Sequence, residues 1–158
     1  ETAGTINEWR RIEAIQIRIV KGESNIKYRT HLADTMWQDW RYNGQMSGTV
    51  NQYRRIEAIE IIAPDLPEGA SIRYKTHLAD TMWSQDWVYN GTMSGTTGQS
   101  RRVEAIIIEL VNAPDYDVMY RVRGEDYGWT NWTTGGQIAG TTGQGKRMEA
   151  IEIKLIKH

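Results

Sequence analysis

Three pairs of tryptophan residues recur along this 158-residue chain at a fixed interval. The first member of each pair is Trp37, Trp83 or Trp129, so the interval is 46 residues in both steps (83 − 37 and 129 − 83). A constant period of this length is typical of repeat architectures, in which neighbouring units bury a common core. The sequence therefore predicts three similar units and a site that occurs up to three times.

A second motif, Arg-x-Glu-Ala-Ile, occurs four times and begins at Arg11, Arg55, Arg102 and Arg147. Each copy is followed by further β-branched residues, alternates apolar and charged side chains for most of its length, and lacks Pro and Gly. This pattern predicts a strand with one solvated face. The alternation slips at the Ala-Ile step, where we expect a β-bulge.

Polar connectors lead from these strands into a second predicted strand, which contains Tyr-x-Thr-His in the first two copies. The connectors, at 21–25, 63–71 and 112–117, are turn-like, and we expect the two strands that each one joins to pair antiparallel. Asn43-Gly44, Asn90-Gly91 and Gly135-Gly136 indicate tight turns after the Trp pairs. No segment has a sustained helical period.

These elements predict one all-β domain, residues 1–158, with pseudo-threefold repetition in a β-prism-like arrangement or, as an alternative, a β-trefoil. Its three repeats span about 26–71, 72–117 and 118–158, and a half repeat, 1–25, precedes them. We expect the strand of the half repeat to pair with the first repeat or to close the ring against the C-terminal strand. A chain of this length can bury one core.

Composition excludes several classes of function. A net charge of −1 with 25% charged residues provides no field for a polyanion, so we expect no nucleic-acid partner. The absence of Cys excludes a disulfide scaffold and a thiolate site. No apolar run approaches the roughly 20 residues that span a bilayer, so we expect no membrane insertion. The chain begins inside a motif, Ala3-Gly4-Thr5, as expected of a piece of a longer protein.

The combined motifs resemble a known repeat family. Trp-x-x-Trp, then Asn-Gly-x-x-(Ser/Ala)-Gly-Thr-Thr-Gly-Gln, then Arg-x-Glu-Ala-Ile-x-Ile is similar to the clostridial hydrophobic repeat with a conserved Trp, the ChW repeat. The resemblance covers nearly the whole chain and implies a module of secreted or surface-attached bacterial proteins, to which carbohydrate or cell-surface binding is ascribed. The family usually has Gly before its first Trp; Gly128 keeps it, whereas Met36 and Met82 replace it.

Aromatic usage favours a sugar site. The chain has no Phe but 7 Trp and 8 Tyr, all with a polar group, which suits a surface that meets a hydrated ligand better than an ordinary core. Burial of about 50 Å² against an indole contributes roughly 1 kcal/mol, and hydrogen bonds to hydroxyls add about 0.5–1.5 kcal/mol each. Single sites are then weak, and several copies compensate through avidity. The alternative is that the indoles belong to the core.

Polar residues flank the Trp pairs and complete the candidate sites. Carboxylates near the indoles recur with the repeat, which fits a multivalent binder better than a single glycosidase pair, and no nucleophile, phosphate or zinc motif is present, so we expect no enzyme and no cofactor. Asp34, Asp39 and Asn43 are oxygen ligands of the kind that Ca²⁺ takes, but their spacing is not that of a dedicated loop and we expect no metal. The Arg and Glu of Arg-x-Glu are interpreted as an ion pair between strands rather than a grip on an acidic sugar. The candidate ligand-binding residues are His31, Asp34, Trp37, Asp39 and Trp40; His77, Asp80, Trp83, Asp86 and Trp87; and Asp126, Trp129, Asn131 and Trp132.

The sequence thus predicts a non-catalytic, lectin-like carbohydrate-binding module of a secreted or cell-surface bacterial protein, whose partner is a glycan or cell-wall polysaccharide. The alternative prediction is a structural or protein-binding module for cell-surface attachment, whose partner is a surface protein. Extracellular localisation is expected in both cases.

Overall fold

The computed structural model describes residues 25–84 and 86–158, and over these residues the chain is all-β, as predicted. No helix among them is long and apolar enough to cross a membrane. The long strands are β1 (Lys27–Leu32), β5 (Ile56–Ile62), β6 (Ser71–Leu78), β10 (Val103–Val111), β11 (Tyr116–Gly124) and β15 (Met148–Lys157). The two-residue strands are β2 (Met36–Trp37), β3 (Arg41–Tyr42), β4 (Ser47–Gly48), β7 (Met82–Trp83), β8 (Val88–Tyr89), β9 (Ser94–Gly95), β12 (Gly128–Trp129), β13 (Thr133–Thr134) and β14 (Ala139–Gly140).

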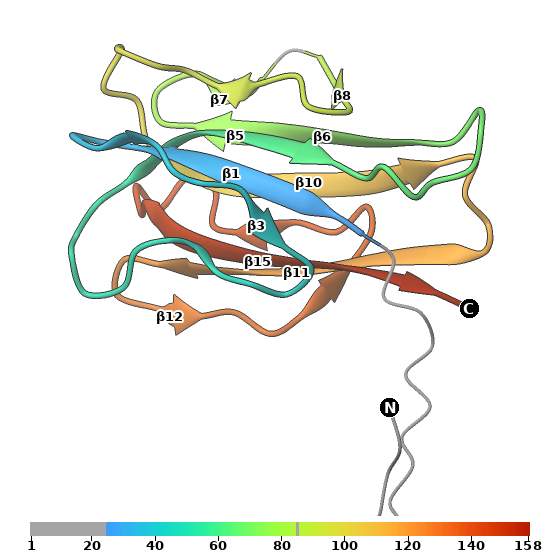
Figure 1. Cartoon of the computed structure of the whole chain (residues 1–158). Helices are drawn as coiled ribbons and strands as arrows, with labels where there is room; N and C mark the ends of the chain where they lie inside the picture. The colour runs from blue at the N-terminus through green and yellow to red at the C-terminus, as the bar shows by residue number, and fades with distance from the viewer. Residues whose placement is uncertain (1–24, 85) are drawn as a thin grey trace, which may run out of the picture.

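Three antiparallel sheets enclose one core, and each is built around the two long strands of one repeat, β1–β5, β6–β10 or β11–β15 (Figure 1). The predicted pairing across the connectors at 63–71 and 112–117 is therefore wrong, whereas the strand before the connector at 21–25 lies outside the described residues. The connectors at 63–70 and 112–115 carry the chain from one sheet to the next, and the paired strands are joined instead through the segment that contains the Trp pair. Turn residues mark where a chain reverses, but they do not determine which strand it then pairs with.

Each sheet is completed by a short strand from another repeat. β9 of the second repeat pairs with β5 of the first, β14 of the third pairs with β10 of the second, and β4 of the first pairs with β15 of the third. The exchange is therefore cyclic, and the ring closes within the described residues. The expected role of the strand in the half repeat concerns residues outside the described range.

A glycine is required where each short strand meets its partner. Gly48, Gly95 and Gly140 have φ values of 114°, 109° and 104°, which L side chains rarely adopt. A Cβ at Gly95 would lie 2.3 Å from the carbonyl oxygen of Glu57, and the other two glycines are equally crowded. The glycine of the Ser/Ala-Gly-Thr sequence is thus required because two backbones approach each other closely at this position.

A β-bulge interrupts each long pair, one residue before the expected position. His31 pairs with Ala58 and Leu32 with Ile56, so Glu57 is the extra residue. Glu104 and Glu149 occupy the same place in the other sheets. All three glutamates are buried. The bulge therefore brings a carboxylate to the end of each sheet, where it needs partners.

Three fully buried tyrosines link the repeats through the core. The Tyr74 hydroxyl accepts a hydrogen bond from the amide of Ile61 in the preceding repeat (2.9 Å) and donates one to the carbonyl of Thr92 in its own repeat. Tyr28 joins Ile153 to Gln45, and Tyr120 joins Ile108 to Gln137, in the same way.

These bonds explain why the chain uses Tyr in place of Phe in its core, and they correct the interpretation that its aromatic residues suit only hydrated surfaces. Burial raises the pKa of Tyr74 and of Tyr120 to about 12, and it raises the pKa of Tyr28 further. The three hydroxyls therefore stay protonated, as their donated hydrogen bonds require.

Replacement of Tyr74 by Phe is expected to lower the free energy of unfolding by about 1–3 kcal/mol, because the amide of Ile61 and the carbonyl of Thr92 lose a buried partner. Urea unfolding measures this change. Tyr42→Phe, at an exposed tyrosine, is the matched control and should change stability by less than about 0.5 kcal/mol. Equal effects of the two substitutions would show that the hydroxyl does not join the repeats.

Candidate functional site

The Trp pairs lie against the outer faces of the three sheets. The first indole of each pair comes from a two-residue strand that pairs back on the long strand, as in the register His31 with Trp37. The second indole precedes the next short strand, β3, β8 or β13. All six indoles are half-buried, so each pair both packs on its sheet and reaches solvent.

In the first repeat, the indoles insert between side chains of β1. Lys27, Arg29 and His31 alternate along one face of this strand, about 7 Å apart. The Arg29 guanidinium lies 4.7 Å from the centroid of Trp40 and 4.8 Å from that of Trp37. Lys27 lies 5.2 Å from Trp40, and the His31 ring meets Trp37 edge-on at 5.5 Å. The five side chains form a stacked ladder held by cation–π contacts.

The second repeat has the same ladder with different cations. Lys75 lies 5.6 Å from Trp83 and 4.8 Å from Trp87, and Arg73 lies 4.5 Å from Trp87. The His77 ring meets Trp83 edge-on at 5.4 Å.

In the third repeat, Arg121 lies 4.7 Å from Trp129 and 4.9 Å from Trp132. Lys154 of the neighbouring strand β15 covers Trp132 at 4.4 Å. All three Trp pairs are therefore occupied by cations of their own sheet.

Ion pairs across the strands vary together with the ladder cation. Arg29 donates to Glu60 at 2.7 Å, and Arg121 donates to Glu152 at the same distance. The second repeat has Lys75 paired with Ile107, and its arginine is two residues earlier, where Arg73 meets Glu109 at 2.6 Å. Each sheet thus keeps one arginine stacked on an indole and bonded to a carboxylate.

The ladder changes the interpretation of the indoles. A cation of the sheet lies over each of the six rings, which leaves less indole surface for a pyranose and fixes the outer segment to the sheet. The second Trp pair has one residue more between its indoles than the first and third pairs. The ladder accommodates this residue because Trp83 belongs to the short strand β7, whereas Trp87 lies on the other side of the insertion, before β8.

The two histidines meet glutamate rather than aspartate. His77 Nδ1 lies 3.2 Å from Glu104, and His31 Nδ1 lies 3.3 Å from Glu57. Both contacts are close enough for an ion pair but lack the geometry of a hydrogen bond. Asp34 and Asp80 are exposed in the turn, at φ 68°, and His77 and Asp80 line one cleft.

The Arg and Glu of Arg-x-Glu form an ion pair, as predicted, but the pair lies within one segment, and the prediction that it joins two strands is wrong. Arg55 bonds Glu57 at 2.8 Å, and Arg102 bonds Glu104 at 2.9 Å. In the third repeat Glu149 receives Arg147 at 3.1 Å and also Arg123, which replaces histidine. Each buried bulge glutamate therefore has a cationic partner.

An open cleft of about 560 Å³ lies where the second and third repeats meet. One wall is the second repeat's sheet end, and the other is the Gly-rich loop that follows β14. The cleft brings together residues that sequence reasoning proposed and residues that it missed: His77, Asp80, Met82, Arg102, Glu104, Thr142, Gly143 and Gly145. The missed loop residues belong to a different repeat from the histidine, so only the cyclic exchange reveals them.

A shallower cavity of about 450 Å³ lies beside the first Trp pair. It includes two candidate residues, Trp37 and Asp39, together with Thr35, Gln38, Arg41, Thr49, Gln52 and Arg54. The corresponding polar residues of the other pairs, Asp86 and Asn131, are exposed, and so is Asp126 in the turn before Trp129. Among the described residues, no group of three or more His, Asp or Glu side chains has the arrangement of a metal site.

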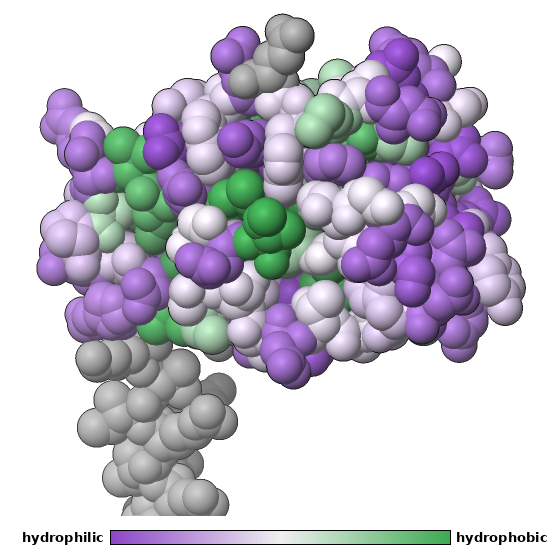
Figure 2. All heavy atoms as spheres, turned by 180° about the vertical axis from the view of Figure 1, so that it is seen from behind, coloured by the Kyte–Doolittle hydropathy of each residue, from purple (hydrophilic) through white to green (hydrophobic). Residues whose placement is uncertain are grey.

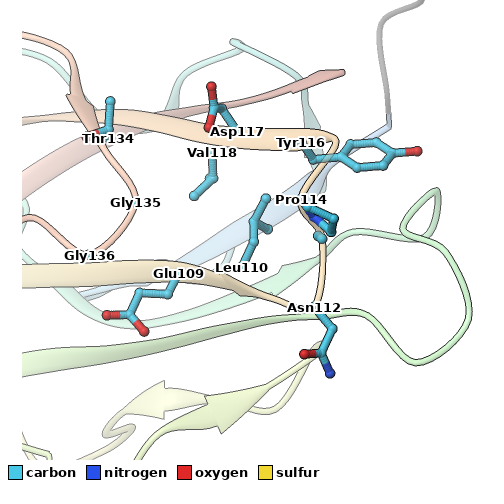
Figure 3. Close-up of a pocket in the computed structure, with 11 residues that line it drawn as sticks. Glu109, Leu110, Asn112, Pro114, Tyr116, Asp117, Val118, Thr134, Gly135 and Gly136 are labelled. Carbon is cyan, nitrogen blue, oxygen red and sulfur yellow. The ribbon is translucent and has the colours of Figure 1, made fainter. Parts of the chain in front are cut away.

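A further cavity contains none of the candidate residues. It has a volume of about 710 Å³ and lies between the β10–β11 connector and the turn at 134–136. Leu110 and Val118 point toward each other across it, whereas Tyr116 points outward (Figure 3). Gly135 stands here in place of the asparagine found in the other two turns, so the space lacks a side chain that those turns have.

Replacement of Arg29 by Ala tests the ladder. It removes the cation between two indoles and leaves Glu60 without its partner, so we expect a loss of about 1–3 kcal/mol in the free energy of unfolding. The double change Arg29→Lys with Glu60→Ile copies the second repeat, Lys75 with Ile107, and should cost less than about 1 kcal/mol. Urea unfolding followed by Trp fluorescence measures both. If Arg29→Ala is neutral, the ladder does not hold the segment.

Comparison with known proteins agrees with the repeat organisation. The family model described as Clostridial hydrophobic W, ChW, matches residues 31–62, 77–112 and 125–157, which together are more than half of the chain. No curated protein and no solved structure matches the chain. The three matches each contain one Trp pair and one Arg-x-Glu-Ala-Ile strand. The chain therefore belongs to the ChW family and carries three of its repeats.

Proposed function

We propose that this domain is a non-catalytic carbohydrate-binding module of a secreted or cell-surface protein and that it binds a glycan or cell-wall polysaccharide at clefts between successive repeats. The observation that supports this most is the cleft between the second and third repeats. Hydrogen-bond donors and acceptors converge there beside an exposed apolar side chain.

The polar groups of the cleft suit a polyhydroxylated ligand. Sugar hydroxyls both donate and accept, and the cleft offers the Arg102 guanidinium, the Asp80 carboxylate and the Thr142 hydroxyl. Arg102 and Glu104 neutralise each other at 2.9 Å, so the cleft carries little net charge. Met82 supplies an apolar surface for the C–H face of a ring.

The size of the cleft fits a short stretch of glycan. A volume of about 560 Å³ lies within the range of about 300–1,000 Å³ typical of small-molecule sites. The cleft is open, so it covers only part of a ring and its affinity should lie in the high micromolar to millimolar range. A polysaccharide presents many equivalent rings, and a repeated site gains avidity from them.

A binding role fits the carboxylates better than catalysis. Glycoside hydrolysis requires an acid and a base or nucleophile about 5–10 Å apart with different environments. Glu104 is buried in its ion pair with Arg102, and the same pair recurs as Glu57 with Arg55. The recurrence indicates a structural unit that shapes each cleft.

Attachment through a protein partner is the second candidate. Met36, Tyr53 and Met82 expose 70%, 80% and 71% of their surfaces, which a protein interface would bury. Figure 2 shows that, on the face turned away from the view of Figure 1, apolar side chains lie in small groups separated by hydrophilic ones. That face offers no broad apolar patch of the kind that stable interfaces use.

Affinity electrophoresis tests the proposal. The domain should be retarded in gels that contain hydroxyethyl cellulose, xylan or glucomannan, or should co-sediment with purified peptidoglycan. Thr142→Arg places a long basic side chain at the cleft wall, and Thr97→Arg does so at the equivalent position in the loop of the second repeat. The double variant should abolish the interaction. Ile138→Arg, an exposed position outside the described cavities, is the matched control and should bind normally.

A folded domain that interacts with none of these glycans would contradict the proposal. Binding of a surface protein by the same domain would then favour the second candidate.

A further inference from the structure

Two methionines are held in a strained backbone conformation at the edge of the clefts. Met36 and Met82 have φ values of 64° and 66°, although side chains with a Cβ disfavour this left-handed region. Gly128 has the same φ, 66°, in the third repeat, where it is free of that penalty. The two methionines are also among the most exposed large apolar side chains of the described residues. Neither packing nor backbone geometry therefore explains a methionine here.

Strain that packing does not explain is concentrated at functional sites. Met82 lines the cleft beside His77, which is buried (8% exposed) and whose Nδ1 faces Glu104 without forming a hydrogen bond. Asp80, Arg102 and Thr142 line the same cleft with side chains that reach solvent. The cleft thus combines a strained, exposed apolar side chain with accessible hydrogen-bond donors and acceptors.

The junction of the first and second repeats has the same composition. The positions equivalent to the cleft residues in the repeat are His31, Asp34, Met36, Arg55 and Glu57 of the first repeat, and Thr97, Gly98 and Ser100 in the loop of the second. The amide of Thr96 bonds the carbonyl of Glu57 at 2.9 Å, as the amide of Thr141 bonds that of Glu104 at 3.0 Å. His31 Nδ1 likewise faces Glu57 without forming a hydrogen bond.

The junction of the third and first repeats is bridged by its own side chains. Arg123 replaces the histidine and bonds both Glu149 and, at 3.0 Å, Asn51 from the loop of the first repeat. Arg147 of the same junction lies 6.0 Å from the ring of Tyr53.

The loop of the first repeat differs from the other two at the positions that face this junction. Asn51 stands where the other loops have Gly98 and Gly143, and Tyr53 stands where they have Ser100 and Gly145. The loops have equal length, and Asn51 and Tyr53 keep the same positive φ, 58° and 56°. The larger side chains of this loop and Arg123 therefore occur on opposite walls of one junction, where the hydrogen bond from Arg123 to Asn51 bridges the walls and the Tyr53 ring stays exposed.

We infer that the domain has two ligand sites, at the first–second and second–third junctions, in which Met36 and Met82 form the apolar platform for a neutral pyranose unit. The sugar's C–H face lies on the methionine, and its hydroxyls bond the accessible polar side chains of the cleft, which are Asp80, Arg102 and Thr142 at the second–third junction. In each site the arginine and glutamate of Arg-x-Glu neutralise each other, which leaves the negative charge of Asp34 or Asp80. An acidic sugar is therefore disfavoured. This assignment rests on the proposed glycan-binding function and adds the number of sites and the class of sugar.

Methionine-methyl NMR tests the assignment. The chain has 6 Met, so protein labelled with ¹³C at these methyl groups gives few signals. It is titrated with the neutral probes cellohexaose, xylohexaose, mannohexaose and chitohexaose, and with hexagalacturonate as the acidic comparison. We expect a neutral probe to shift the Met36 and Met82 signals and to leave the buried Met148 signal unchanged.

Met82→Gly separates function from folding. It should weaken binding at its own cleft roughly fivefold, leave the titration of Met36 unchanged, and raise the melting temperature by about 2–4 °C as the strain is relieved. Met93→Ala, at an exposed methionine with no place in either cleft, is the matched control and should change neither affinity.

Two results would overturn the assignment. If a probe binds while both methionine signals stay fixed, or if Met82→Gly binds as the unchanged protein does, the platform is wrong although glycan binding stands. If no probe shifts any resonance of the folded domain, the proposed function is wrong, and the assignment of the two sites is then wrong as well.

Discussion

Exchange of hydrogen bonds between repeats is the constraint on which the rest of this structure depends. A single repeat leaves its sheet without an edge strand and leaves one strand amide in the core without an acceptor. The next repeat supplies both, through a Ser/Ala-Gly strand and through a buried tyrosine hydroxyl such as that of Tyr74. The first repeat does the same for the third, so the array closes into a ring. Unlike an open solenoid, the domain then has no terminal repeat among its described residues that lacks a neighbour.

The ring also creates the surfaces on which the proposed function depends. Each cleft has one wall from a sheet and one from the loop of another repeat, so the strands Ser94–Gly95 and Ala139–Gly140 position a loop and complete a sheet at once. The Trp pairs contribute less directly than their prominence in the sequence implies. Their indoles stack on cations of the sheet, which leaves the neighbouring methionines as the more exposed apolar side chains at two junctions.

Local patterns predicted what is local in this fold. The 46-residue period, the alternation of the Arg-x-Glu-Ala-Ile strands and their ion pairs follow from nearest-neighbour physics, and the structure has all three. Strand partners could not be predicted, because a connector rich in Pro and Gly fits a sheet-to-sheet crossing as well as a hairpin. The glutamate beside His31 could not be predicted for a related reason: one bulge residue at Glu57 redirects a carboxylate toward the histidine. Arg123 and Asn51 are 72 residues apart and meet only because the ring closes.

Native-state hydrogen exchange of three amides tests the closed ring most directly. The amides of Ile61, Ile108 and Ile153 each donate to a tyrosine hydroxyl of another repeat. If the ring opens only as a unit, all three should exchange with the free energy of global unfolding and agree within about 1 kcal/mol. The Ile153 amide depends on Tyr28 at the closure between the last repeat and the first. Exchange at Ile153 about 100-fold faster than at the other two would contradict the account, because it would mean that the repeats form a linear array that opens from its end.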